Sequence, residues 1–389
     1  MQNVYILGTG ATTVAEHWER TAISLAREAF NSAFQGVQEY GIDTGRIDTL
    51  YLASALGNAL GGQSNLAAAI SAACGMRGLE AHQIDAGGAS GGVALRQAYT
   101  AIAGGMANIV AVVGVEKVSD VLDTQREAAL SLGSDVDWEA VQGTTLTAQW
   151  ALLMRRYMHV YGVDASAFAA FPVNAHANAV SNAQAMYRFK INAEKVTAAA
   201  MVADPISLLD SSTLADGAAA LILVSPAIAR EIGRPLIRIA GSAVASDTLA
   251  LHGRSDPLWL DAAARVTQAA LKAAQLQRSD IQLLDLSDQH GIAAALALES
   301  SGFVERGSAT SMAREGGIHV NGTLPLATAG GCKARGDTLG ALGIYQIVEL
   351  CRQLRGEAGP AQVSSARVAM AQCLGGIGTS AAAHILVAE

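Results

Sequence analysis

The sequence predicts an α/β protein made of two similar halves, in which helices cover both faces of parallel sheets. Short apolar runs alternate with amphipathic stretches, the order of elements repeats after about residue 235, and 40 of the 389 residues are glycine. Alternating strands and helices are typical of parallel sheets between helical layers. The chain has many glycines but only seven prolines, which indicates tight turns and close helix contacts, not a flexible linker.

The first half begins with a short apolar run over residues 4–7, which ends at Gly8 and Gly10. A run of this kind is typical of a buried strand that leads into a loop. An amphipathic helix is expected over residues 21–40, followed by a second strand over residues 47–52.

The second half repeats this order. A strand is expected over residues 236–240, ending at Gly241, then a helix over residues 260–274 and a strand over residues 283–286. In each half a glycine-rich stretch then precedes a helix, at residues 87–92 in the first and at residues 336–343 in the second. The parallel predicts a duplicated unit with two helices that approach closely at its centre.

The composition limits the function. The chain is too long for one average domain, and with 51% hydrophobic and 15% charged residues it predicts a large core and further burial in an oligomer. A net charge of -8 without a basic run argues against nucleic acid as a partner. The chain contains no window of about 18 uninterrupted apolar residues, so no membrane-spanning helix is expected. Residues 1–8 lack the features of a signal peptide, so a cytoplasmic location is expected.

Four cysteines, none in a C-x-x-C pair, indicate neither a zinc site nor a disulfide framework: Cys74, Cys332, Cys351 and Cys373. Any metal in the working complex is expected to come from a partner. No bound cofactor is expected.

Residues 84–92 read Ile-Asp-Ala-Gly-Gly-Ala-Ser-Gly-Gly before a helical run, and this resembles the strand-turn-helix elbow of thiolases, above all the archaeal-type and sterol-carrier-protein thiolases. Residues 201–223 and 322–350 resemble further thiolase blocks. The resemblance implies the α/β thiolase fold, with duplicated βαβαβαββ halves in a five-layered α-β-α-β-α arrangement.

The resemblance also implies the domain boundaries. Residues 1–235 form the N-terminal half and residues 236–389 the C-terminal half. A loop domain at about residues 120–210 would cover the acyl-CoA.

By this resemblance Gly88 stands where thiolases carry their acyl-accepting cysteine. A glycine has no side chain to acylate, so covalent acyl transfer is not expected here. Ser90 is interpreted as a cap of the elbow. The Gly88 N–H remains at the positive end of a helix, where it can donate to a thioester oxygen.

Residues 286–290 occupy the place of an element that orders a water in a thiolase oxyanion hole. Ser287 replaces a histidine, Asp288 is kept, and His290 stands where a phenylalanine is usual. If the segment begins a helix, His290 lies one turn from Ser287 on about the same face. His290 is then either a displaced catalytic imidazole or a structural residue.

Residues 330–343 resemble the block that carries the catalytic histidine of thiolases, and Asp337 replaces that histidine. An ionised carboxylate would repel an enolate, so a Claisen condensation is electrostatically opposed unless Asp337 is protonated. Residues 372–378 resemble the loop whose cysteine handles the α-proton. Cys373 is therefore either catalytic or a packing residue.

Two functions remain open. One is an enzyme that cleaves a carbon-carbon bond beside a CoA thioester without covalent catalysis, as thiolase-like retro-aldolases do. Asp337 or His290 would then be the base, while the Gly88 N–H and the loop of Gly375 and Gly376 hold the thioester oxygen. Those aldolases are expected to carry tyrosine where this chain has Ser287 and Asp337.

The other function is a catalytically inactive subunit that binds a thiolase paralogue, a synthase, or the small zinc-ribbon and OB-fold protein that accompanies archaeal-type thiolases. Polar groups at the altered positions favour the enzyme. Either way, acyl-CoA is the expected ligand, and a homodimer or a heteromer is the expected assembly.

Overall fold

The structure is a computed structural model that describes residues 2–389. Its strands are β1 (Tyr5–Ala11), β2 (Thr49–Ala53), β3 (Glu80–Ile84), β4 (Ile109–Glu116), β5 (Met201–Ala203), β6 (Ile206–Ser207), β7 (Gly217–Val224), β8 (Ile237–Ser246), β9 (Leu283–Leu286), β10 (Val368–Gly375) and β11 (Ser380–Ala388). Its α-helices are α1 (Ala22–Gln38), α2 (Gly57–Gly61), α3 (Leu66–Ala73), α4 (Ser90–Ala103), α5 (Asp123–Ser131), α6 (Leu146–Tyr161), α7 (Ala170–Ala179), α8 (Ala193–Ala198), α9 (Pro226–Ile232), α10 (Asp261–Ala274), α11 (Gly291–Ser300), α12 (Ala309–Arg314) and α13 (Leu342–Arg355).

Nine strands follow one another in the order β3-β2-β4-β7-β1-β8-β11-β10-β9. The first five belong to the N-terminal half and the last four to the C-terminal half, and the two sets meet where Tyr5 and Ile6 pair with Arg238 and Ile237. Only β2 with β3 and β4, and β9 with β10, run parallel. The expectation of parallel sheets is therefore wrong for the other pairs. One reason is the short turn between β10 and β11, which can only join antiparallel strands.

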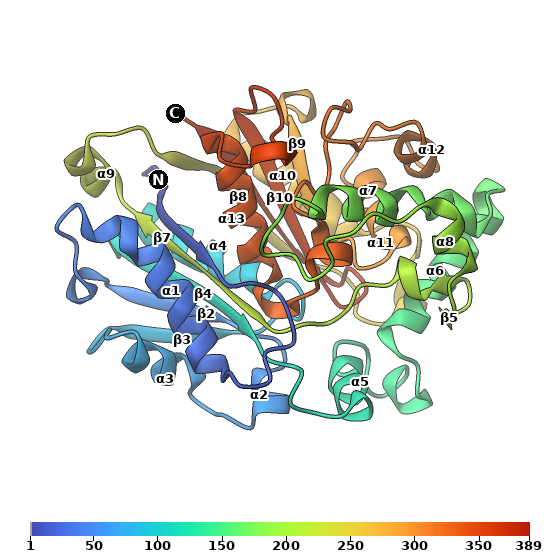
Figure 1. The fold of residues 1–389 in the computed structure, drawn as a ribbon, viewed down its shortest axis with the longest axis horizontal. Coiled ribbons are helices and arrows are strands. Elements are labelled where there is room, and N and C mark those ends of the chain that lie inside the picture. Colours follow the sequence, from blue (N-terminus) through green and yellow to red (C-terminus); the bar gives the residue numbers. More distant parts are fainter. Residues whose placement is uncertain (1) are drawn as a thin grey trace.

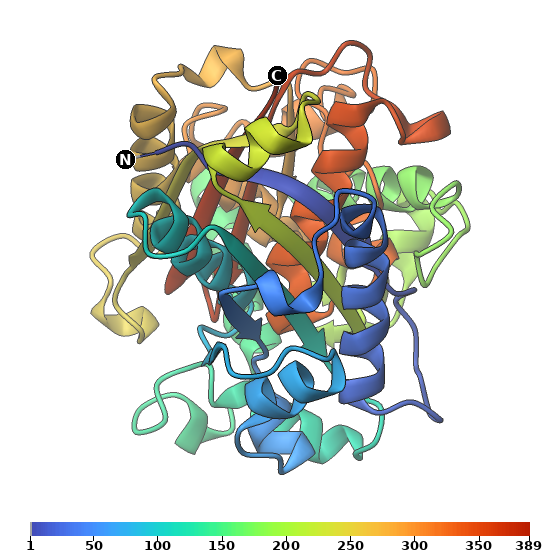
Figure 2. The same cartoon turned by 90° about the vertical axis from the view of Figure 1, so that its left-hand side faces the viewer.

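The helices form three layers around the two sets of strands (Figures 1 and 2). Helices α1 and α3 pack on the outer face of the N-terminal strands, and α10 covers the outer face of β8 and β11. Helices α4 and α13 contact each other between the two sets, and α4 contacts strands of both. This gives the expected five-layered α-β-α-β-α order.

Several predicted elements match the structure closely. Helix α1 begins after Thr21, whose side-chain oxygen accepts the Ser24 N–H at 3.1 Å. Helix α10 ends at Ala274 and β9 covers residues 283–286, as expected from their hydrophobic periodicity.

The glycines expected to end the first strand of each half do not end it. Strand β1 continues through Gly8 to Ala11, and β8 continues through Gly241 to Ser246. A Cβ at Gly8 would overlap the carbonyl oxygen of Ala33 in α1, and a Cβ at Gly241 would overlap that of Ala270 in α10. Both glycines thus allow an outer helix to lie against the strand, and the two halves share this feature.

The C-terminal half lacks a full third strand. The corresponding segment makes only a single bridge, between Leu326 and Leu284. Pro325 has no N–H to donate to a ladder, and Ala327 has a φ of 52°, which is incompatible with a strand. The C-terminal half therefore departs from the expected βαβαβαββ order at this one strand.

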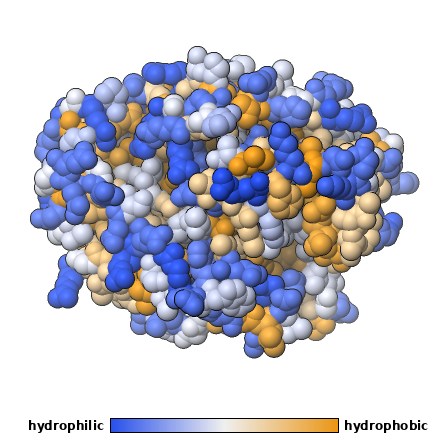
Figure 3. All heavy atoms as spheres, viewed as in Figure 1, coloured by the Kyte–Doolittle hydropathy of each residue, from blue (hydrophilic) through white to orange (hydrophobic). Residues whose placement is uncertain are grey.

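Residues 120–210 fold into helices α5 to α8 and the β5–β6 hairpin, which lie along the right-hand side of Figure 1, from α7 down to α5. Most of the large apolar side chains that are exposed belong to this loop domain, among them Leu122, Leu132, Val136, Trp138, Val141 and Phe189. In the view of Figure 3, apolar residues also gather on the right-hand half of the surface. Within residues 2–389 no helix is long and apolar enough to cross a membrane, and the cytoplasmic location stays a prediction.

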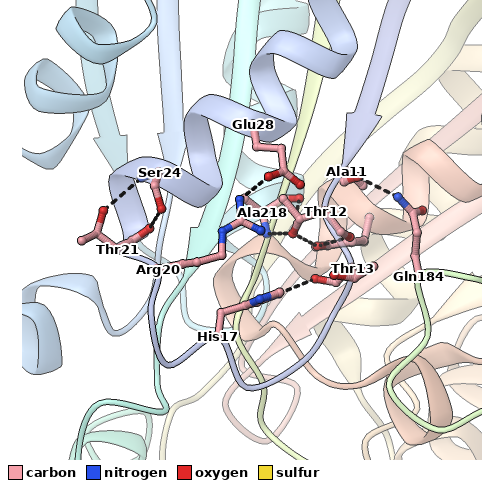
Figure 4. Close-up of polar contacts among 11 residues, drawn as sticks. Ala11, Thr12, Thr13, His17, Arg20, Thr21, Ser24, Glu28, Gln184 and Ala218 are labelled. Atoms are coloured by element: carbon pink, nitrogen blue, oxygen red, sulfur yellow. Dashed lines mark hydrogen bonds and ion pairs between the residues drawn. The ribbon is translucent and has the colours of Figure 1, made fainter.

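The end of β1 contacts the loop domain, and the segment after β1 is held by a contact of its own (Figure 4). The side-chain amide of Gln184 donates to the Ala11 carbonyl at 2.7 Å, and a ring nitrogen of His17 lies 2.9 Å from the Thr13 carbonyl. These contacts place Glu16, which lies between them in sequence, at the edge of the cavity described below.

Candidate active site

A cavity of about 590 Å³ lies where the loop domain meets both halves. Its wall includes Gly88 from the first half, His290, Asp337 and Gly376 from the second, and Trp150 from the loop domain. Four of the residues singled out from the sequence are thus brought together. Ser287, Cys373 and Gly375, also singled out, are not part of the wall.

The elbow before α4 is closed by its own serine. The Ser90 hydroxyl accepts the Ala86 N–H at 2.8 Å and donates to the Gly87 carbonyl at 2.6 Å. Because Ala89 is the N-cap, Ser90 is the first helical residue, and its hydroxyl locks the turn instead of capping the helix. The Gly88 N–H meets no hydrogen-bond acceptor within residues 2–389.

A backbone carbonyl fills the space beside Gly88. A Cβ at this residue would lie 2.5 Å from the carbonyl oxygen of Leu374 in β10, closer than real Cβ contacts allow. Of the four cysteines in the described part of the chain, none lines the cavity. The wall around Gly88 therefore offers no thiol. The view that Gly88 replaces a cysteine stays a prediction from the resemblance.

The glycine loop after β10 lies against the elbow. A Cβ at Gly87 would be 3.5 Å from both the Cα of Gly375 and the nitrogen of Gly376. The Gly376 N–H, like that of Gly88, has no acceptor in the described part of the chain. Two unpaired N–H groups on one cavity wall are suited to binding an oxyanion.

Asp337 presents a buried carboxylate to the same cavity, with only 6% of its surface exposed. Its Oδ1 accepts the Leu339 N–H at 2.9 Å, and its Oδ2 accepts the hydroxyl of Ser212 at 3.2 Å. Burial raises the pKa of Asp337, and the hydrogen bonds from Leu339 and Ser212 only partly oppose this. A carboxylate with a raised pKa, held in place by two donors, is suited to general base catalysis.

His290 lies on the cavity wall beside the start of α11. Its backbone is extended, with a φ of -141°, and the helix begins only at Gly291. The expected one-turn helical relation between Ser287 and His290 is therefore absent. Burial, helped by the charge of Lys333, lowers the pKa of His290 to about 3, so the imidazole is neutral near pH 7.

A buried ion pair fixes this corner of the site. Lys333 Nζ lies 3.0 Å from Asp210 Oδ1, and the same oxygen accepts the Gly291 N–H at 3.0 Å. Both charged side chains are at most 5% exposed. The pair connects the block that contains Asp337 to the start of α11 beside His290.

Ser287 and Asp288 lie behind the cavity wall. The fully buried Ser287 oxygen accepts the Leu374 N–H at 2.9 Å. Asp288 Oδ1 accepts the Cys332 N–H at 2.6 Å, and burial raises the pKa of this carboxyl. Both residues thus bind neighbouring backbone, and neither faces the space where a substrate would sit.

Cys373 faces the two central helices. Its Sγ lies 3.7 Å from the Ala89 carbonyl oxygen. A Cβ on Gly92 or on Gly343 would lie 2.5 or 3.0 Å from that sulfur, so the thiol packs between α4 and α13. Burial raises the pKa of Cys373 to about 12.

The mouth of the cavity is mainly acidic. Glu16, Asp123 and Glu127 line it together with Arg126, which forms an ion pair with Asp123. A negatively charged ligand therefore gains little from this chain at the mouth.

Two residues of the site were missed from the sequence. Ser212 belongs to a polar run at residues 211–213 just before the buried strand β7, and this run was the available signal. Leu374 contributes its backbone carbonyl to the cavity wall, and a sequence pattern of side chains cannot predict a role of the backbone.

Comparison with known families decides the identity of the fold. The family model described as "Thiolase, N-terminal domain" matches residues 4–227, and "Thiolase C-terminal domain-like" matches residues 243–388. The chain belongs to the thiolase superfamily. The predicted fold class and family are thereby confirmed.

Individual relatives match nearly the whole chain. An "Acetyl-CoA acetyltransferase" of Methanothermobacter thermautotrophicus is 37% identical over 99% of both chains. A "17-hydroxy-3-oxo-4-pregnene-20-carboxyl-CoA lyase" of Mycobacterium tuberculosis is 29% identical over 90% of this chain and 91% of the relative. A solved structure described as "Ltp2-ChsH2(DUF35) aldolase" has a TM-score of 0.84 and 26% identity, covering 99% of this chain and 98% of the other.

Proposed function

We propose that this thiolase-superfamily protein cleaves a carbon-carbon bond next to an acyl-CoA thioester by retro-aldol chemistry, without an acyl-enzyme. The observation that carries the proposal is the make-up of the cavity wall. It holds two unpaired N–H groups, at Gly88 and Gly376, and the carboxylate of Asp337, but no thiol. These groups match the needs of a retro-aldol step and not those of acyl transfer to the enzyme.

Asp337 takes the proton of the β-hydroxyl, the oxygen electron pair forms a carbonyl, the Cα–Cβ bond breaks, and its electrons pass to the thioester oxygen. The N–H groups of Gly88 and Gly376 stabilise the resulting enolate. The α-carbon then takes a proton from Asp337 or from water. His290, with its low pKa, is the weaker base and is assigned a hydrogen-bonding role.

The charge of Asp337 favours the retro-aldol step over a Claisen condensation. In the retro-aldol step Asp337 becomes neutral as the enolate forms, so the two negative charges never coexist. In a condensation that begins with proton removal from the acetyl group by another base, an ionised Asp337 would face the enolate. The replacement of histidine by aspartate, expected from the sequence, is thus compatible with the one reaction and opposed to the other.

Two relatives support the lyase reading. The mycobacterial protein is named as a lyase of a CoA thioester, and the solved structure is described as an aldolase with a DUF35 component. The archaeal relative, named as an acetyltransferase, has the higher identity, so relatedness alone does not select the reaction. The make-up of the cavity wall is the observation that supports the retro-aldol step.

The test is a turnover assay with a panel of 3-hydroxyacyl-CoA thioesters of different length and branching. The expected products are a shortened acyl-CoA and an aldehyde or ketone in equal amounts, measured by mass spectrometry. The same panel is run with the Asp337→Asn variant, which should form both products at least about 100-fold more slowly. Acyl-CoA turnover with a covalent acyl adduct on the chain would overturn the proposal.

A non-catalytic subunit is the second candidate, favoured by the exposed apolar side chains of the loop domain and the acidic mouth of the cavity. Such a surface is suited to a partner that brings its own charge and covers apolar area. A paralogue, a small zinc-ribbon and OB-fold protein, or a second copy in a homodimer are the proposed partners. Purification of the native complex tests this. Turnover that survives Asp337→Asn in the complex assigns the chemistry to the partner.

A further inference from the structure

We infer that the Leu374 peptide, held in place by Ser287, is the acceptor that recognises the β-hydroxyl of the substrate. The inference rests on the proposed function and deepens it, because it assigns the feature that tells a β-hydroxyacyl thioester from a plain acyl thioester. Ser287 then acts as a positioning residue, although its side chain does not reach the cavity.

The Leu374 carbonyl is free of the sheet. Leu374 lies opposite Ala381 in the antiparallel β10–β11 pair. Residues opposite each other in such a pair either exchange both backbone hydrogen bonds or neither. The Leu374 N–H is given to Ser287 Oγ at 2.9 Å, so this pair exchanges neither bond. In the described part of the chain, no other N–H donates to the Leu374 carbonyl outside the strands.

This carbonyl lies at the cavity, beside Gly88. Leu374 lines the cavity beside Gly88, and its oxygen is 2.5 Å from the point where a Cβ at residue 88 would stand. Since N and Cβ of one residue are about 2.5 Å apart, the oxygen is within about 5 Å of the Gly88 nitrogen. A free acceptor and a free donor thus lie next to each other on one wall.

This donor and this acceptor match the two oxygens of a β-hydroxyacyl thioester. In a β-hydroxyacyl thioester the carbonyl oxygen and the hydroxyl are carried on carbons separated by one carbon. The thioester oxygen accepts from the Gly88 N–H. In the resting complex the hydroxyl donates its single hydrogen to the Leu374 carbonyl, and for the reaction the hydroxyl turns so that this hydrogen passes to Asp337. A thioester without the hydroxyl leaves this buried acceptor unpaired, and so binds less well.

The experiment compares the binding of two probes that differ only in the hydroxyl, 3-hydroxybutanoyl-CoA and butanoyl-CoA, by calorimetric titration. All variants are made in an Asp337→Asn background, so that the probe is not turned over during the titration. The hydroxyl should strengthen binding about three- to tenfold, the value of one net hydrogen bond. Ser287→Ala, which frees the Leu374 peptide, should shrink this ratio towards one while the affinity for butanoyl-CoA stays the same.

Gly88→Ala is the second variant, because its Cβ must displace the Leu374 carbonyl. It should also abolish the preference for the hydroxyl. Gly36→Ala is the matched control, since a Cβ there meets no atom within 4 Å, and it should keep the full preference. If Gly88→Ala fails to fold, Ser287→Ala alone decides.

The outcomes separate the two proposals. Equal binding of both probes to the background protein overturns the inference but leaves the proposed function standing. Binding of neither probe contradicts the proposed function itself. An unchanged preference in Ser287→Ala removes the positioning role.

Discussion

The hydroxyl of Ser212 donates to Oδ2 of Asp337 across 3.2 Å, on the wall of the cavity. The other carboxylate oxygen accepts the Leu339 N–H at 2.9 Å, so the carboxylate plane is fixed from two sides. Ser212 comes from the loop before β7 and Asp337 from the block before α13, more than one hundred residues later. A contact of this kind aims a base at a substrate, and its loss should reduce catalysis without removing it.

Asp337→Asn keeps the size and most hydrogen bonding of the side chain but removes the base. We expect turnover of a productive 3-hydroxyacyl-CoA to fall about two to four orders of magnitude, with substrate affinity nearly unchanged. Ser212→Ala serves as the graded control, with a loss of about tenfold or less. Steady-state kinetics check both, and full turnover in Asp337→Asn would contradict the assignment.

The pH dependence of turnover follows from the same residue. A general base works in its deprotonated form, and burial raises the pKa of Asp337 above that of an ordinary aspartate. The value of kcat/KM should therefore fall as the pH decreases through a midpoint above about 3.9. A pH profile between 4 and 9 measures this midpoint. A flat profile over that range would argue against a carboxylate base.

His290→Ala and His290→Gln separate charge from hydrogen bonding. The pKa of His290 is lowered to about 3, first by burial and then by Lys333, so the ring carries no charge between pH 5 and 8. His290→Gln should therefore retain more activity than His290→Ala, and neither should shift the midpoint of the pH profile. If both His290 variants lose all turnover while Asp337→Asn keeps it, the base is His290. Undiminished turnover in both Asp337→Asn and His290→Ala would contradict the catalytic roles assigned to these two residues.

Much of the fold could be predicted because its signals are local. The span of β9 and the end of α10 follow from apolar periodicity alone. The ends of β1 and β8 could not be predicted, because Gly8 and Gly241 resemble turn residues in sequence. Their role is set by helices that pack on them from elsewhere in the chain.

The site was harder to predict than the fold. The sequence placed Asp337 and His290 among the candidates, and the structure brings both to one cavity. The sequence did not predict on which face of β10 the Cys373 side chain lies. That depends on the register of β10 with β11 and on the contact of β10 with α4. The role of the Leu374 peptide depends on which bonds β10 leaves unmade, and only the assembled sheet reveals it.

Gly88→Cys should not create a thiolase. Its Cβ would lie 2.5 Å from the Leu374 carbonyl oxygen, so the variant should lose stability by about 1–3 kcal/mol as the loop moves aside. We expect no acetyl adduct by intact-mass spectrometry after incubation with acetyl-CoA, in the parent chain or in the variant. The Gly36→Cys change is the control for general thiol reactivity. Acetoacetyl-CoA thiolysis by Gly88→Cys would show that the nucleophile was the only missing part.

Glu116 should control stability and not chemistry. Its carboxylate accepts four hydrogen bonds, from the Ser54 hydroxyl and from the N–H groups of Ala55, Leu56 and Gly340. A glutamine would replace one oxygen, which can accept a hydrogen bond even when it is protonated, with an NH2 group that only donates and that faces other donors. Glu116→Gln should therefore lower the free energy of unfolding by about 2 kcal/mol or more. Urea unfolding measures this.

The pH dependence of that loss has a definite sign. Burial raises the pKa of Glu116 to about 7 in the folded protein despite its hydrogen bonds, against 4.5 when unfolded. The folded state binds the extra proton between these values, so the contribution of Glu116 to stability is full below 4.5 and is lost as the pH rises through 7. The gap between the parent chain and Glu116→Gln should be larger at pH 5 than at pH 8. A larger gap at pH 8 would mean that the four donors keep the carboxylate ionised.

Cys373→Ala tests whether this thiol takes part in the reaction. The sulfur packs between α4 and α13 away from the cavity wall, and burial raises the pKa of Cys373 to about 12, so almost no thiolate exists at neutral pH. Turnover of the variant should stay within about threefold of the parent, while the free energy of unfolding falls by about 1 kcal/mol because a small cavity replaces the sulfur. Iodoacetamide at pH 8 should leave Cys373 unmodified in the folded protein and label it in urea. A loss of turnover as large as that of Asp337→Asn, with stability unchanged, would instead place the thiol in the proton transfer at the α-carbon.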